Sequence, residues 1–202
     1  MNTIKRVCVF CGSNNGARPE YLAAAENLGR ALLREKIGLV YGGANVGMMR
    51  RIADVVHDGG GEVIGVITAG LMEKEIGHRR LSDLRVVSSL HKRKALMSEL
   101  ADGFIALPGG LGTLDELFEV LTWAQLGIHH KPCGLLNVGD YYRLLLAFLK
   151  HAVAERLVRR EHLEMLLVAR SARALIGRMR LYRPVRVEKW IDLDRGKGRV
   201  LQ

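Results

Sequence analysis

A glycine-rich segment at residues 108–112 places a loop suited to anions next to a carboxylate. It follows the apolar run 104–107 and precedes a helical pattern, so the sequence predicts a strand, a tight turn and the start of a helix. Glycines at such a junction let backbone N–H groups approach an anion, and the helix N-terminus adds the positive end of its dipole. Glu116 stands in the first turn of the predicted helix. The segment therefore combines a phosphate site with a group able to act as acid, base or nucleophile.

The same residues also fit a purely structural motif. In the spacing Thr113-x-x-Glu116, Thr113 could cap the helix while Glu116 reaches back to the N–H of the capping residue, as in a capping box. Capping does not require three preceding glycines, and their presence favours a ligand. The two roles are compatible.

Arg93 lies on an otherwise apolar face of another predicted helix. Leu90, Arg93, Met97 and Leu100 follow the i, i+3, i+7, i+10 spacing of one helix face. A charge on an inward face needs a partner to offset its loss of water. The candidates for that partner are Glu116 and a bound phosphate.

A phosphate loop, an arginine and a carboxylate together fit cleavage of the glycosidic bond in a nucleoside 5′-monophosphate. That bond breaks through an oxocarbenium-like state, which a nearby carboxylate can stabilise or trap. Glu116 would be the nucleophile or the general base toward water. Arg93 would orient Glu116 and keep it ionised, or bind the ribose phosphate, and Lys94 could add a charge at the same anion. The sequence does not indicate which group protonates the departing base.

Short apolar runs alternate with helical patterns along the chain. Strands are expected at residues 7–11, 39–41, 63–67, 84–87, 104–107, 134–136 and 165–168, and helices at 19–36, 46–58, 90–101, 114–127, 141–153 and 172–182. Strands that are apolar throughout predict a doubly wound, Rossmann-like α/β fold, in which helices cover both faces of a parallel sheet. Ligands in such folds bind beyond the carboxyl ends of the strands, where the glycine clusters fall.

Other nucleotide and metal motifs are missing from the sequence. No G-x-G-x-x-G follows the first predicted strand, and no G-x-x-x-x-G-K-[ST] is present, which argues against NAD and against a P-loop ATPase. His91, His129 and His130 lack the spacing of metal ligands, so no metal site is expected.

Size and composition indicate one domain. The chain has 202 residues, of which 49% are hydrophobic. We expect a nucleotide-binding domain over residues 1–182 and a basic C-terminal arm over residues 183–202. Because no apolar stretch reaches ~18 residues and the N-terminus leads directly into a strand, we expect a cytoplasmic protein without membrane association. Cys8, Cys11 and Cys133 are expected to be reduced, packed thiols.

The positive charge is concentrated near the C-terminus. The net charge is +10, and residues 151–202 hold 13 Lys or Arg against 6 Asp or Glu. Such an excess can attract nucleic acid. However, these residues are spread through amphipathic helical sequence without interleaved aromatic side chains, so a solvated surface is favoured and nucleic-acid binding is not expected.

The sequence resembles the Lonely Guy (LOG) family in its glycine-rich segment, P-G-G-L-G-T-L-D-E at residues 108–116. Residues 91–94 and 122–129 also match the family pattern. The resemblance also includes residues 11–13, 41–43, 47–49 and 131–137. It implies a phosphoribohydrolase of cytokinin riboside 5′-monophosphates that forms homodimers and needs no metal or organic cofactor. An older family label is lysine decarboxylase, but no lysine here lies in an evident pyridoxal phosphate context.

The resemblance also assigns site residues. It implies catalytic roles for Arg93 and Glu116. Contacts with the nucleotide are expected from Gly12, Ser13, Gly43, Glu75, Lys94, Gly110, Leu111, Gly112, Thr113, Leu114, Asp115 and Thr122. Two positions depart from the family pattern, since Leu90 replaces a methionine and Ala44 replaces a glycine. A Cβ at position 44 could narrow the approach of the backbone to a ligand.

The main alternative is a carrier that holds a nucleotide or phosphorylated cofactor without reacting. Related folds use similar glycine loops for that purpose. A carrier has no need of a carboxylate near C1′, so Arg93 together with Glu116 favours the enzyme.

Overall fold

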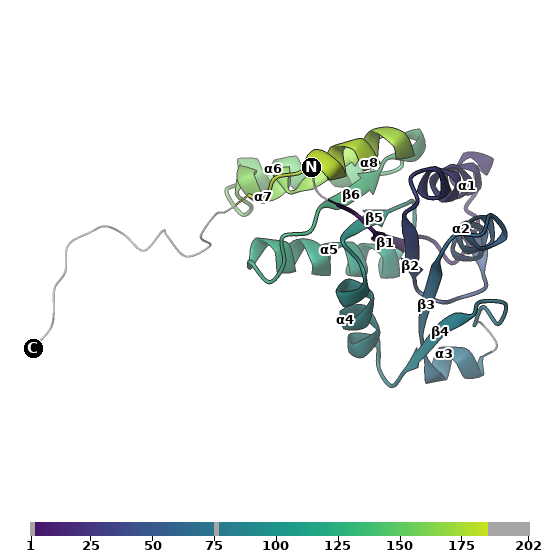
Figure 1. Cartoon of the computed structure of the whole chain (residues 1–202). Coiled ribbons are helices and arrows are strands. Elements are labelled where there is room, and N and C mark those ends of the chain that lie inside the picture. The colour runs from purple at the N-terminus through teal and green to yellow at the C-terminus, as the bar shows by residue number, and fades with distance from the viewer. Residues whose placement is uncertain (1–2, 75–76, 186–202) are drawn as a thin grey trace, which may run out of the picture.

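The computed structural model describes residues 3–74 and 77–185, and its centre is one parallel sheet. The strand order is β4-β3-β2-β1-β5-β6-β7, and every neighbouring pair is parallel. The strands are β1 Arg6–Phe10, β2 Gly38–Tyr41, β3 Val63–Thr68, β4 Asp83–Val87, β5 Gly103–Ala106, β6 Cys133–Leu136 and β7 Leu166–Ala169. Figure 1 shows the sheet running through the molecule between its helices.

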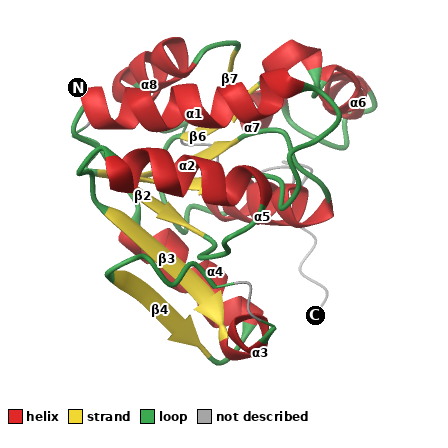
Figure 2. Ribbon diagram, turned by 90° about the vertical axis from the view of Figure 1, so that its right-hand side faces the viewer, coloured by secondary structure: helices red, strands yellow, loops and turns green. Residues whose placement is uncertain are grey.

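Helices cover both faces of the sheet, as the apolar strands predict. The helices are α1 Pro19–Arg34, α2 Gly47–Asp58, α3 Ala69–Glu73, α4 Leu90–Leu100, α5 Leu111–Gln125, α6 Arg143–Ala154, α7 Arg160–Glu164 and α8 Ala172–Leu181, with a 3₁₀ turn at Val138–Asp140. Val7 and Val9 of β1 pack with α1, α2 and α8, whereas Cys8 and Phe10 pack with α4 and α5. In Figure 2, α1 and α2 lie in front of the strands and α4 behind them. The predicted doubly wound α/β fold is confirmed.

Most predicted elements agree with the structure to within about two residues at each end, the usual uncertainty of helix boundaries. The short helices α3 and α7 were not predicted, because a five-residue helix is too short to show a helical period. The helix predicted from residue 114 begins at Leu111 instead.

The loops after β1 and β5 lie next to each other at the point where the strand order reverses. From β1 the chain builds β2, β3 and β4 on one side, and then crosses to β5 on the other side of β1. The N–H of Gly12, after β1, donates to the carbonyl oxygen of Pro108, after β5, at 3.0 Å. This reversal opens the crevice in which doubly wound folds bind ligands.

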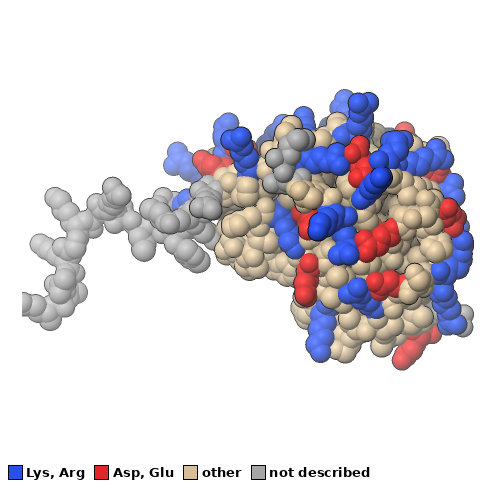
Figure 3. Space-filling model, in the orientation of Figure 1, with Lys and Arg blue, Asp and Glu red and all other residues tan. Residues whose placement is uncertain are grey.

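The surface carries charges of both signs. On the face in Figure 3, acidic side chains lie among basic ones, and ion pairs such as Arg6–Glu62 and Arg85–Asp83 join them. Among the described helices, none has the length and apolar character needed to cross a bilayer. The predicted domain boundary falls just after α8, and the arm beyond residue 185 lies outside the described residues.

Candidate active site

A buried ion pair forms the centre of the site. Arg93 of α4 and Glu116 of α5 meet with Nη1 and Oε1 3.2 Å apart, and their side chains are only 11% and 13% exposed. The inward-facing charge on α4 therefore has the carboxylate partner that its place in the helix predicts. The two helices lie on the same face of the sheet and flank β5.

Backbone carbonyls hold the rest of the Arg93 guanidinium. Its Nε donates to the carbonyl oxygen of Val66 in β3 at 2.9 Å, and Nη2 donates to that of Gly42 after β2 at 3.2 Å. A Cβ at Gly42 would overlap Nη2 of Arg93. Gly42 thus provides the space in which the guanidinium lies, a role that the sequence alone did not assign to it.

The environment of Glu116 suits proton transfer near neutral pH. Burial raises the pKa of its carboxyl group, and the Arg93 charge lowers it, with a net rise from 4.5 to about 7. Both protonation states are therefore populated near neutrality. A pKa close to the working pH is the property expected of a general acid or base.

The N-terminus of α5 has backbone donors available for an anion. Gly110 occupies the N-cap position and no side chain caps the helix. Within the described part of the chain, the N–H groups of Leu111, Gly112 and Thr113 have no acceptor. A Cβ at Gly110 or Gly112 would meet open space. Free donors, open space and the helix dipole are features that suit the binding of a phosphate.

The capping-box interpretation of Thr113 and Glu116 is wrong. Thr113 is the third residue of α5 rather than its cap, and Glu116 lies in the second turn, where its side chain contacts Arg93. Thr113 is buried, and its hydroxyl occupies the space that a Cβ at Gly109 would need. Packing of Thr113 in the helix therefore leaves the cap position to Gly110, which adopts the extended backbone required there.

The loops after β1 and β2 lie beside this helix start. Gly12 contacts the β5–α5 loop through its bond to Pro108, and Ser13 packs against Gly47 at the start of α2. Gly43 has a φ of +72°, and its carbonyl accepts from the N–H of His78 at 2.9 Å. The backbone of Gly43 thus shapes the turn after β2, while its contact with substrate stays a prediction.

Lys94 of α4 pairs with two carboxylates of α5, the helix that also carries Thr122. The Lys94 ammonium is 3.1 Å from both Asp115 and Glu119. Burial lowers the pKa of Lys94, but its hydrogen bonds to the two carboxylates outweigh burial, so the pKa is raised overall. Thr122 is exposed and donates to the carbonyl of Phe118. The charge of Lys94 lowers the pKa of the nearby Glu116 carboxyl group, and the charges of Asp115 and Glu119 raise it. The contacts of Lys94, Asp115 and Thr122 with nucleotide stay predictions.

Two apolar residues complete the predicted set. Leu111 is 87% exposed at the start of α5, and Leu114 is half-buried one turn later. Glu75 lies outside the described residues. The contacts of Leu111, Leu114 and Glu75 with nucleotide stay predictions.

The histidines and cysteines have structural surroundings. The ring of His129 packs on Phe104, and burial lowers the His129 pKa to about 4. The three cysteines are free and buried, and burial raises the pKa of Cys133 to about 12. Over residues 3–74 and 77–185, no group of three His, Cys, Asp or Glu side chains could hold a metal ion.

Tyr141, which belongs to no motif of the sequence, also contacts the loop. Its hydroxyl donates to the carbonyl oxygen of Gly109 at 2.7 Å. The residue follows the strand β6, and its position after a strand at the ligand-binding edge was the one available signal.

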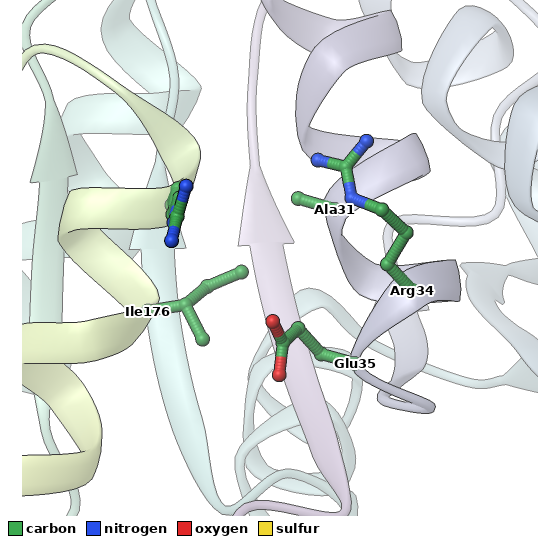
Figure 4. Close-up of a pocket in the computed structure, with 5 residues that line it drawn as sticks. Ala31, Arg34, Glu35 and Ile176 are labelled. Atoms are coloured by element: carbon green, nitrogen blue, oxygen red, sulfur yellow. The ribbon is translucent and has the colours of Figure 1, made fainter.

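A second depression lies away from this site. It has a volume of about 310 Å³ and lies between α1 and α8 (Figure 4), lined by Ala31, Arg34, Glu35, Arg173 and Ile176. Arg34 and Glu35 stand at the end of α1, and the loop after β1 leads into its start. None of these residues belongs to the Arg93–Glu116 site, and Arg34 therefore offers a control position.

Comparison with known proteins places the chain in a family. The family described as "Possible lysine decarboxylase" matches residues 49–179. Cytokinin riboside 5′-monophosphate phosphoribohydrolase LOG7 of Arabidopsis thaliana is 46% identical over 196 residues, which are 95% of this chain and 90% of that protein. The chain belongs to the LOG family. Another member, the probable phosphoribohydrolase LOGL9 of Oryza sativa subsp. japonica, is 49% identical over 90% of this chain and 80% of its own length.

Solved structures support the fold of this LOG-family chain. The molybdenum cofactor binding protein from the phototrophic bacterium Rippkaea orientalis superposes with a TM-score of 0.65 and 24% identity, covering 87% of this chain and 94% of that one. At this identity the likeness shows the fold alone.

Proposed function

We propose that this protein hydrolyses the N-glycosidic bond of N6-modified adenosine 5′-monophosphates, that is, cytokinin riboside 5′-monophosphates, releasing the free base and ribose 5-phosphate. The observation that carries the proposal is the buried Arg93–Glu116 pair beside the uncapped start of α5. The LOG-family relatives, named for this activity, support it.

The phosphate anchors the nucleotide at α5. The N–H groups of Leu111, Gly112 and Thr113 donate to its oxygens, and the open space at Gly110 and Gly112 admits it. Binding energy from this remote group then positions the ribose for reaction at C1′.

Glu116 acts at C1′. As the bond between C1′ and the base breaks, the Glu116 carboxylate stabilises the positive charge on the ribose and takes a proton from the attacking water. The water oxygen bonds to C1′, and the departing base leaves with the bonding electrons and takes up a proton. The net reaction consumes one nucleotide and one water.

Arg93 orients Glu116 in this scheme. Its guanidinium is held on three sides, by Glu116 and by the carbonyls of Gly42 and Val66. This anchoring favours orientation and partial ionisation of Glu116 over binding of the phosphate.

A second copy of the chain covers the outer face of α5 in our proposal. A shallow depression of about 490 Å³ lies there, lined by Leu114, Asp115, Phe118, Glu119, Thr122 and Trp123. In a homodimer, the contacts expected from Lys94 and Thr122 would operate near this interface. Size-exclusion chromatography with light scattering tests this part, and a monomer at assay concentration would refute it.

The cytoplasm is the proposed compartment. The free, buried Cys8, Cys11 and Cys133 suit a reducing environment.

Product analysis tests the reaction. Purified protein is incubated with AMP, N6-isopentenyl-AMP and the matching ribosides, and free base and ribose 5-phosphate are quantified. We expect base from the monophosphates and hardly any from the ribosides, because the loop serves the phosphate. Equal rates on both would refute the phosphate anchor. Recovery of bound, intact nucleotide would identify a carrier instead.

A further inference from the structure

Two consecutive tyrosines before α6 bind the backbone of the β5–α5 loop. The hydroxyl of Tyr141 donates to the carbonyl oxygen of Gly109 at 2.7 Å, and that of Tyr142 donates to Leu107 at 2.6 Å. The two bonds hold the Leu107–Pro108 peptide group and the Gly109–Gly110 peptide group. The loop that we assign to phosphate is thus supported from outside its own helix.

The surroundings of the tyrosines fix where their hydroxyls lie. The backbone N–H of Tyr142 donates to the side-chain oxygen of Asn137 at 2.9 Å, and the Tyr142 ring is buried. Tyr141 is 43% exposed, and its ring meets that of Tyr21 edge-on at 5.5 Å between centroids. Tyr141 therefore reaches the loop from the solvent side with its ring already held.

The peptide that Tyr141 contacts is an easily rotated one. It joins two glycines, Gly109 and Gly110, and neither has a Cβ to oppose rotation of the peptide plane. In a trans peptide the C=O and the N–H point in opposite directions. Holding the carbonyl of Gly109 thus also fixes the direction of the N–H of Gly110, which has no acceptor among the described residues.

We propose that the Tyr141 hydroxyl locks the Gly109–Gly110 peptide so that the N–H of Gly110 joins those of Leu111, Gly112 and Thr113 as a phosphate donor at the start of α5. Tyr141 is then a positioning residue that acts through the backbone and does not touch the reacting atoms. The inference rests on the proposed function to the extent that the nucleotide phosphate binds at α5.

Tyr142 provides a matched control. Its bond holds the carbonyl of Leu107, but the next residue is Pro108, which has no N–H. Loss of the Tyr142 hydroxyl can loosen the fold without changing a donor. We therefore expect Tyr142→Phe to lower the melting temperature and leave phosphate affinity unchanged.

An alanine at position 110 can replace the lock. Gly110 has a φ of −93°, and a Cβ there meets nothing within 4 Å. Rotating the peptide plane by about half a turn would bring this φ into the positive region, which alanine disfavours. Gly110→Ala therefore holds the peptide without help from Tyr141. Because its Cβ enters the space that we assign to phosphate, the effect of Tyr141→Phe is compared within each background.

The experiment measures the affinity for ribose 5-phosphate by calorimetry in wild type, Tyr141→Phe, Tyr142→Phe, Gly110→Ala and the Tyr141→Phe/Gly110→Ala double variant. Tyr141→Phe should weaken binding about tenfold, the scale of one hydrogen bond to a charged group. In the Gly110→Ala background the same change should weaken binding less than about twofold, because alanine already holds the peptide.

Each contrary result overturns the lock in a different way. Unchanged affinity in Tyr141→Phe would show that the hydroxyl is not needed. An equal loss in both backgrounds would show that the hydroxyl contacts the ligand directly, and an equal loss in Tyr142→Phe would show general loosening of the loop.

Binding and turnover separate this inference from the proposed function. If wild type binds ribose 5-phosphate but releases no base from nucleotides, the proposed function fails and the lock can still be tested. If wild type does not bind ribose 5-phosphate, the phosphate site and the lock are both refuted.

Discussion

Replacing Glu116 by glutamine should change how the stability of the protein depends on pH. Burial raises the pKa of Glu116 from 4.5 to about 7, although the charge of Arg93 opposes the rise. A carboxyl group with a raised pKa in the folded state stabilises the fold fully below pH 4.5, and this contribution is lost as the pH rises through about 7. The loss is about 3 kcal/mol, because each pKa unit corresponds to about 1.4 kcal/mol.

Glutamine keeps the shape of the side chain and can accept from Arg93, but it does not ionise. The free energy of unfolding of Glu116→Gln, relative to wild type, should therefore increase by about 3 kcal/mol between about pH 4 and about pH 8. Urea denaturation at several pH values measures this difference. Asp115→Asn, which removes an exposed carboxylate of the same helix, is the control and should show a smaller change. Parallel stability curves for wild type and Glu116→Gln would refute the reasoning from burial.

Three substitutions test the ion pair through the release of free base. Glu116→Gln should lower turnover about 100-fold or more, the scale for losing a positioned acid–base group, and a fully active variant would remove Glu116 from the chemistry. Arg93→Ala should cause a similar loss of turnover. The double variant should lose much less turnover than the product of the two single losses, because groups that act as a unit are not additive. A joint role would be contradicted if the two single losses of turnover multiplied in the double variant, or if the control Arg34→Ala lost as much turnover. Gly42→Ala should lower activity about tenfold or more because its Cβ displaces the guanidinium. Gly70→Ala should not lower activity, because a Cβ at Gly70 meets open space. Equal activity of Gly42→Ala and Gly70→Ala would show that the guanidinium tolerates displacement.

The sheet could be predicted because its strands have a simple signature. Strands such as β1 and β5 are buried on both faces, so they read as continuous apolar runs between helices. The fold class follows from that alternation. The first residue of α5 was harder to predict from the sequence, because both Gly110 and Thr113 are suitable caps. The choice between them depends on how Thr113 packs against Gly109.

The pairing of Arg93 with Glu116 could be predicted, but the groups that hold the pair could not. Arg93 stood out because a charge interrupts an apolar helix face, and Glu116 because it follows the glycine loop. The bonds from Arg93 to Val66 and Gly42 depend on where the ends of β3 and β2 lie in space. The bond from Tyr141 to Gly109 joins residues 32 positions apart in sequence, and no local pattern records it.

The placement of Arg93 and Glu116 on the two helices that flank β5 has an evolutionary consequence. Both residues come from one continuous stretch, α4–β5–α5, whereas the loops after β1, β2 and β3 arrive from other parts of the chain. Apart from Gly42, whose carbonyl holds Arg93, those loops can diverge in length and composition while Arg93 and Glu116 keep their separation. Conversely, if Arg93 and Glu116 act as proposed, changing only these two side chains would convert a hydrolase into a holder of phosphorylated ligands and leave the remaining architecture in place.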